Sequence, residues 1–191
     1  FEQYIPYPNR ETSFILDGDL PSGKYLNNNF CSKLSKTHGE MHILNSGRLV
    51  GLSLRDINYL CQQKIHIHSY GSNSPLVYCA QQANPTYFHV HGYCSPKDWV
   101  TEYSQYDAGL SHCFLSNNEL VRTSWDDLNI PAKMNTFAIA GLPMIQRNNS
   151  GHIVATQRIA DTFDCNISFS TLEELVETLR NTKRMAELTH H

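Results

Sequence analysis

Apolar runs alternate with amphipathic stretches along the chain from Met41 onward. Short apolar runs bounded by turn residues predict buried strands, and the amphipathic stretches between them predict helices. This alternation is typical of βαβ units, so the sequence predicts an α/β fold with a doubly wound, mostly parallel sheet. The expected strands span residues 41–44, 65–69, 87–91, 108–112, 144–145 and 167–169.

Capping residues mark several helix boundaries. Ser53, followed three residues later by Asp56, predicts a helix start, and Gly141 with Pro143 shortly after it predicts a helix end. In a doubly wound fold the ligand crevice lies at the carboxyl ends of the strands. The expected helices span residues 53–63, 97–106, 132–140, 151–162 and 171–184.

The length of 191 residues, with 40% hydrophobic residues, suits one buried core. Residues 1–40 are rich in Pro, Gly and Asn and show little periodicity, so we expect an irregular lead-in or inter-domain segment there. The predicted domain covers 41–185, and 186–191 form a tail. Because the chain begins at Phe1 rather than Met, we expect it to be part of a longer protein.

Composition excludes several classes of partner. A net charge of −3 without a Lys/Arg-rich run does not favour nucleic acid. No apolar stretch is long enough for a transmembrane segment. Six cysteines are dispersed without a Cys-x-x-Cys pair, which favours free thiols and a cytoplasmic location.

Histidine is abundant, with ten residues in the chain. The pairs His66/His68 and His89/His91 have the spacing that places both rings on one face of a strand. Such pairs are either metal ligands or histidines packed within a sheet. Because no cysteine or carboxylate stands at an accompanying ligand spacing, we expect no metal and no cofactor.

The stretch from Trp125 to Ile145 is the most informative for chemistry. It reads as a loop, a helix with Lys133 in its first turn, and a Gly-x-Pro turn into a buried strand. A helix start with a nearby lysine suits an anion such as a diphosphate. The alternative is that Lys133 is a solvated surface charge, and local physics favours neither interpretation.

This stretch resembles the Pro-x-Lys-x-x-Glu-Tyr-x-Ala-x-Gly-x-Pro signature of GT-B glycosyltransferases of the family 4 kind. Further similarity runs over roughly residues 41–182 and includes the turn at 45–48, Tyr70-Gly71, the element at 99–109 and the stretch at 151–154. The residues in register with the signature are Pro131, Lys133, Phe137, Gly141 and Pro143.

The resemblance implies the Rossmann-like C-terminal half of a GT-B fold. It implies a donor domain that binds a nucleotide-diphospho-sugar as substrate, in carbohydrate biosynthesis with retaining chemistry. The sugar would pass to a glycan or lipid-linked acceptor held by an N-terminal GT-B domain. That domain would also supply the catalytic base, so we expect the isolated chain to be inactive.

Site residues carry over by position. Arg48 and Lys133 would neutralise the diphosphate, and Gly47 would let the backbone approach it. Gly151 and His152 correspond to a glycine-led helix start near the donor. The remaining candidates are possible donor contacts, namely His91, Arg122, Asn129 and Pro131. His91 also suits a structural role, and Arg122 also suits a surface ion pair.

Two positions depart from the family pattern. Thr136 stands where the family has a glutamate that holds the ribose hydroxyls, and a neutral hydroxyl is a weaker acceptor than a carboxylate. The lysine that usually follows the Gly-Arg turn is absent, because residues 49–52 are Leu-Val-Gly-Leu. Thr136 therefore favours one alternative function, a non-catalytic glycan-related scaffold.

A nucleotide-sugar epimerase half is a second alternative. It has less support, because no pair of carboxylates is placed for proton transfer. Nucleotide binding separates the scaffold from both enzyme classes, since only the enzymes require it.

Overall fold

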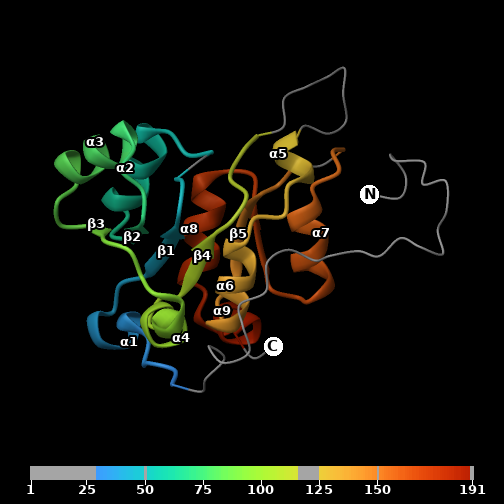
Figure 1. The fold of residues 1–191 in the computed structure, drawn as a ribbon. Helices are drawn as coiled ribbons and strands as arrows, with labels where there is room; N and C mark the ends of the chain where they lie inside the picture. The colour runs from blue at the N-terminus through green and yellow to red at the C-terminus, as the bar shows by residue number, and fades with distance from the viewer. Residues whose placement is uncertain (1–28, 50, 116–124, 150, 190–191) are drawn as a thin grey trace.

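A computed structural model describes residues 29–49, 51–115, 125–149 and 151–189. Its centre is a six-stranded sheet in the order β3-β2-β1-β4-β5-β6, with every neighbouring pair parallel (Figure 1). The predicted doubly wound, parallel α/β fold is therefore confirmed, and the strand order is that of a Rossmann-like sheet. The strands are β1 (His42–Ser46), β2 (His66–Tyr70), β3 (Phe88–His91), β4 (Ala108–Leu110), β5 (Met144–Arg147) and β6 (Asn166–Phe169).

Helices connect the strands on both faces of the sheet. They are α1 (Leu34–His38), α2 (Leu54–Gln62), α3 (Pro75–Ala83), α4 (Trp99–Tyr103), α5 (Trp125–Leu128), α6 (Lys133–Ile139), α7 (Ala155–Thr162), α8 (Leu172–Arg180) and α9 (Thr182–Leu188), with a 3-10 turn at Pro96–Asp98 before α4. None of the helices in the described ranges is long and apolar enough to cross a membrane.

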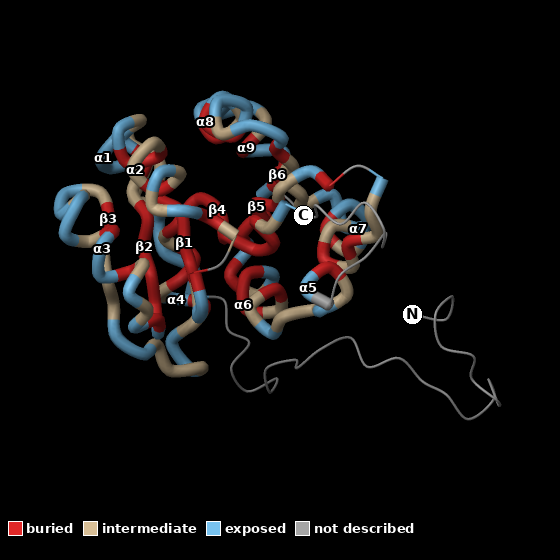
Figure 2. Tube along the Cα trace, turned by 90° about the horizontal axis from the view of Figure 1, so that it is seen from above, coloured by how far each residue is buried: buried red, intermediate tan, exposed pale blue. Residues whose placement is uncertain are grey.

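Two hydrophobic clusters hold the helices against the sheet. The strands are largely buried between the helices in the view from above (Figure 2). One cluster joins Ile43, Ile67 and Phe88 to α2, α3, α8 and α9. The other joins Leu44 and Met144 to α4, α6 and α7. Ile43 and Leu44 are adjacent on β1 and fully buried on opposite faces, which explains why the strand reads as a continuous apolar run.

Three helical predictions need correction. The expected helix at 171–184 is two helices, because the Asn181 side chain accepts a hydrogen bond from the Arg184 N–H and starts α9. The expected helix at 97–106 is the 3-10 turn followed by the short α4. The start expected at residue 151 lies at Ala155 instead.

The helix start at Ser53 is confirmed as a full capping box. The Ser53 hydroxyl accepts from the Asp56 N–H, and an Asp56 carboxylate oxygen accepts from the Ser53 N–H at 2.7 Å. We expect Ser53→Ala to lower the free energy of unfolding by about 1 kcal/mol, because the Asp56 N–H loses its cap. Urea denaturation measures this loss, and exposed Arg55→Ala on the same helix, as the control, should change stability by less than about 0.5 kcal/mol.

Candidate functional site

A cavity of about 230 Å³ lies where the strand order reverses. From β1 the chain proceeds to β2 and β3 on one side, whereas β4, beside β1, leads to β5 and β6 on the other. Ser46 at the end of β1 and Ser111 just after β4 both line the cavity. Ligands of open α/β sheets bind at this position, outside the carboxyl ends of the strands.

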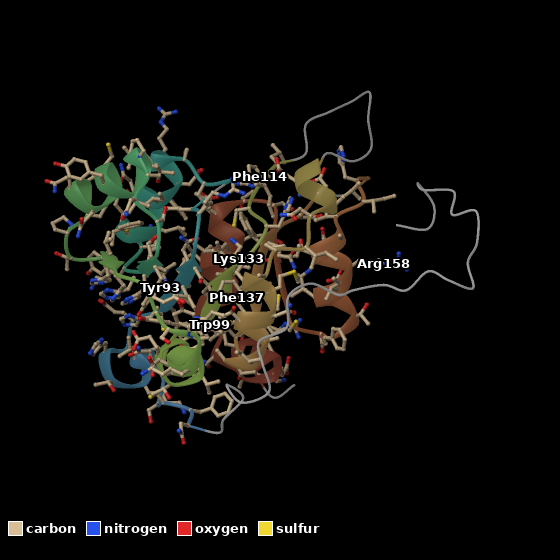
Figure 3. The ribbon with its side chains drawn as sticks, viewed as in Figure 1. Tyr93, Trp99, Phe114, Lys133, Phe137 and Arg158 are labelled. Carbon is tan, nitrogen blue, oxygen red and sulfur yellow. The ribbon has the colours of Figure 1, made fainter. Side chains whose placement is uncertain are left out.

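Two cationic side chains line the cavity from different elements. Arg48 follows β1 and is exposed, and Lys133 begins α6 and is half-buried. Burial, with a smaller contribution from Arg48, lowers the pKa of Lys133 below its ordinary value, although nearby Cys113 opposes the shift. Figure 3 labels Lys133, with Phe114 above it and Phe137 further along α6.

Two buried polar side chains face the same cavity. Ser111 is 4% exposed and His112 is 5% exposed. Among the residues that the structure describes, the Ser111 hydroxyl and both ring nitrogens of His112 have no hydrogen-bond partner. Native proteins pair nearly all buried polar atoms, so these groups are candidates for contacts with a ligand.

His112 also contacts a buried carboxylate. Its Nε2 lies 3.2 Å from Oδ1 of Asp127 in α5, within ion-pair distance but outside hydrogen-bond geometry. Burial lowers the pKa of His112, and Asp127 opposes that shift. A neutral ring that turns an N–H toward Asp127 presents Nδ1 as an acceptor, for example for a ligand hydroxyl.

The start of α7 adds backbone donors. Thr156 in its first turn lines the cavity, and its hydroxyl donates to the Gln146 side chain at 2.7 Å. No side chain caps the helix at Val154. The first N–H groups of a helix have no partner within it, so an uncapped start can bind an anion.

The structure brings together several of the residues predicted from sequence. Arg48, Asn129, Pro131 and Lys133 all line the cavity. Gly47 lies between Ser46 and Arg48 with φ of +80°, a conformation that suits glycine, and leaves the space around its Cα open.

Four other predicted residues are not among those that line the cavity in the described part of the chain. Thr136 is buried, and its hydroxyl donates to the Ala132 carbonyl within α6. Gly151 and His152 precede α7. His91 is on β3, where its ring contacts β2. Arg122 lies outside the described residues, and the roles assigned to all these residues stay predictions.

Sequence reasoning missed Ser111, His112 and Thr156 as site residues. A signal for the first two was present, because the predicted strand at 108–112 ended on them, and polar residues at the end of a buried strand point to the crevice. Thr156 had no such mark in the sequence, since it lay inside the expected helix at 151–162.

The histidine pairs lie within the sheet. His66 and His68 are on β2, and His89 is on β3 beside His68. In the described ranges, no group of three or more His, Cys, Asp or Glu side chains is arranged to hold a metal ion. All six cysteines are free thiols.

Comparison with known proteins finds a distant likeness among solved structures. No protein-family model matches the sequence, and no curated protein matches it. A crystal structure of the glycotransferase of kitacinnamycin is similar in fold, with a TM-score of 0.44 and 11% identity. The likeness covers 83% of this chain and 41% of that chain, so this chain spans less than half the length of that protein.

Proposed function

We propose that this chain is the donor domain of a GT-B glycosyltransferase and binds a nucleotide-diphospho-sugar in the cavity between β1 and β4. One observation carries the proposal. The cavity combines two cations, Arg48 and Lys133, with two buried polar side chains. Ser111 has no hydrogen-bond partner in the described structure, and His112 contacts Asp127. A nucleotide sugar has both of the complementary features, an anionic diphosphate and hydroxyl-bearing rings.

The diphosphate would lie between the two cations. Arg48 can donate to it in a bidentate manner, and Lys133 supplies a point charge from a half-buried position where screening by water is reduced. The uncapped start of α7 would add backbone donors. Such positive groups stabilise a departing nucleotide diphosphate without a metal ion.

The sugar or ribose hydroxyls would meet Ser111 and His112. Nδ1 of a neutral His112 accepts one hydroxyl proton, and the Ser111 hydroxyl can donate or accept. Asp127 would act by positioning the His112 ring rather than by touching the donor. The acceptor and the catalytic base would come from an N-terminal GT-B domain, so transfer needs both halves.

The first experiment is calorimetric titration of the chain with UDP, GDP and their common sugar conjugates, with uridine and guanosine as matched nucleosides. We expect binding of one diphosphate series and at least tenfold weaker binding of its nucleoside. Failure to bind any nucleotide would favour the non-catalytic scaffold that Thr136 suggests. Equal binding of nucleoside and diphosphate would contradict the role of the two cations.

Ser111→Ala should separate binding from stability. A buried hydroxyl without a partner costs about 1–3 kcal/mol in the empty protein, so its removal should leave the free energy of unfolding unchanged or raised. Affinity for the nucleotide sugar should fall about tenfold, which corresponds to one lost hydrogen bond of about 1.4 kcal/mol.

Ser69→Ala is the matched control. Ser69 is also fully buried, but its hydroxyl accepts from the Asn45 side chain at 3.1 Å, so this variant should lose stability instead. A Ser111→Ala variant that is less stable but binds normally would show that Ser111 has only a structural role.

A further inference from the structure

Five histidine side chains cover one face of β1, β2 and β3. The parallel register places His42 beside His66, and His68 beside His89, with His91 next to Tyr70. Ring centroids are 4.2 Å apart between His42 and His66 and 4.5 Å between His68 and His89, both stacked. We call these five residues, His42, His66, His68, His89 and His91, the histidine ladder.

Hydrogen bonds join the rings head to tail across the strands. His42 Nδ1 lies 2.9 Å from His68 Nε2, and His68 Nδ1 lies 3.0 Å from His91 Nε2. In a second row, His66 Nδ1 lies 3.0 Å from His89 Nε2. His66 Nε2 lies 2.9 Å from the Glu40 carboxylate, so it donates there and His66 Nδ1 must accept from His89.

These contacts require mostly neutral rings. A neutral imidazole has one N–H and one lone pair, so each N···N contact is satisfied by a single proton. A protonated ring donates from both nitrogens, so two neighbouring protonated rings would place two N–H groups against each other. Positive rings stacked at these distances also repel one another.

Burial of the rings also favours their neutral form. His42 is 2% exposed and His68 is 6% exposed. Desolvation, with the neighbouring histidines, lowers the pKa of His42 to about 4 and that of His68 to about 2. Desolvation also lowers the pKa of His89 and His91 from their ordinary value.

The other charged and titratable groups around the ladder do not cancel the lowering of the histidine pKa values. Near β1 and the segment before it, Glu40 is paired with His66, His38 adds another imidazole 3.3 Å from His42, and Asp107 accepts from the His42 N–H. On the α4 side, Glu102 accepts from the Tyr70 hydroxyl. The remaining titratable rings in contact with the ladder are Tyr70, Tyr87 and Tyr106.

We propose that the histidine ladder is an acid-sensitive element that holds β1, β2 and β3 together at neutral pH and loosens them in mild acid. The inference goes beyond the proposed function and does not depend on it. Loosening of β1 would also disturb the cavity, because β1 ends at Ser46, a cavity-lining residue.

The direction of the pH effect follows from linkage. Four ladder histidines have lower pKa values in the folded chain than in the unfolded chain, namely His42, His68, His89 and His91. The unfolded chain therefore binds more protons once the pH falls below about 6.5. Stability is then lost as the pH falls through this window. A histidine shifted from 6.5 to about 4 lowers the folding equilibrium constant roughly sevenfold between pH 6 and pH 5. His42 and His68 together should therefore lower it by about fiftyfold.

The test is the folding equilibrium constant of the chain, measured by urea denaturation between pH 5 and pH 7. We expect the folding equilibrium constant of wild type to fall at least about fiftyfold between pH 6 and pH 5. For His68→Phe the factor by which it falls should be about seven times smaller. Ile67→Val is the matched control on the same strand. Its side chain lies on the opposite face, so it should lower stability equally at every pH.

A second variant covers the case in which His68→Phe does not fold. His89→Gln alters a half-buried position on the edge strand β3 and should also weaken the pH dependence. The proposal is overturned if wild type is equally stable at pH 5 and pH 7. It is also overturned if every folded ladder variant keeps the wild-type pH dependence.

Discussion

Replacement of Arg48 and Lys133 by alanine should weaken nucleotide-diphosphate binding more than any other pair of changes at the cavity. A hydrogen bond to a charged group contributes about 1.5–3 kcal/mol, so each variant should raise Kd by about ten- to a hundredfold. Calorimetric titration with the preferred diphosphate measures this effect. Both residues line the cavity, and Arg48 is exposed, so its replacement should change stability little.

Lys97→Ala is the control for charge alone. Lys97 is exposed on the 3-10 turn before α4 and is not among the residues that line the cavity, and its removal changes net charge equally. Its Kd should stay within about twofold of wild type at physiological salt. Equal losses for Lys97→Ala and Lys133→Ala would contradict a specific site.

Lys133 also predicts how binding depends on pH. Its pKa is lowered by burial, so the free protein loses the ammonium charge at a lower pH than an exposed lysine would. A bound diphosphate favours the charged form, so affinity should fall as the pH rises through this lowered pKa. A pH series of titrations should show this fall for wild type, and Lys133→Ala should show a weaker pH dependence.

Gly51→Ala should produce the largest loss of stability among single changes near the site. Gly51 has φ of +80°, and an added Cβ would lie 2.3 Å from the Cys113 carbonyl carbon and 2.4 Å from the Phe114 nitrogen. These are backbone atoms and cannot rotate away. We expect a loss of about 3 kcal/mol or more in the free energy of unfolding, from conformational strain and overlap together. Binding should also weaken, because Phe114 lines the cavity.

Gly71→Ala separates strain from overlap. Gly71 has φ of +69°, but no atom lies within 4 Å of an added Cβ. This variant should lose only about 1–2 kcal/mol, the cost of the left-handed conformation. Denaturation of both variants by urea gives the comparison. A Gly51→Ala variant no less stable than Gly71→Ala would show that the segment at Cys113 is free to move.

Much of the fold could be predicted because local patterns agree with the final packing. The predicted strand at 65–69 and observed β2 at 66–70 coincide within one residue, since Ile67 needed burial in either case. Helix α3 was missed although Ser74 caps it and Pro75 begins it. Its buried side chains are Val77 and small Ala80, which leave a weak periodic signal.

The site was only partly predictable, because it depends on which strands become neighbours. Arg48 and Lys133 were identified by resemblance, but the sequence did not bring Ser111 beside them. That requires β4 to pair with β1 rather than with β3, which precedes it in the chain. Thr136 was assigned to the donor by alignment with a glutamate; it is buried on α6, and its role at the donor stays a prediction.

The histidine ladder was also only partly predictable, because it too depends on which strands become neighbours. The i, i+2 pairs on β2 and β3 indicated rings on one face of a strand, but not that His42 of β1 would join them. Strand register decides that contact, and a shift of one residue would move the rings to the opposite face.

The most direct test of the central claim is a map of backbone amide chemical shifts as the chain is titrated with UDP-sugar and GDP-sugar conjugates. If the cavity binds the donor, the shifts should concentrate at the ends of β1 and β4, near Arg48 and His112, and at the first turns of α6 and α7. Shifts confined to other surfaces, or no shifts with either series, would contradict a donor site between β1 and β4.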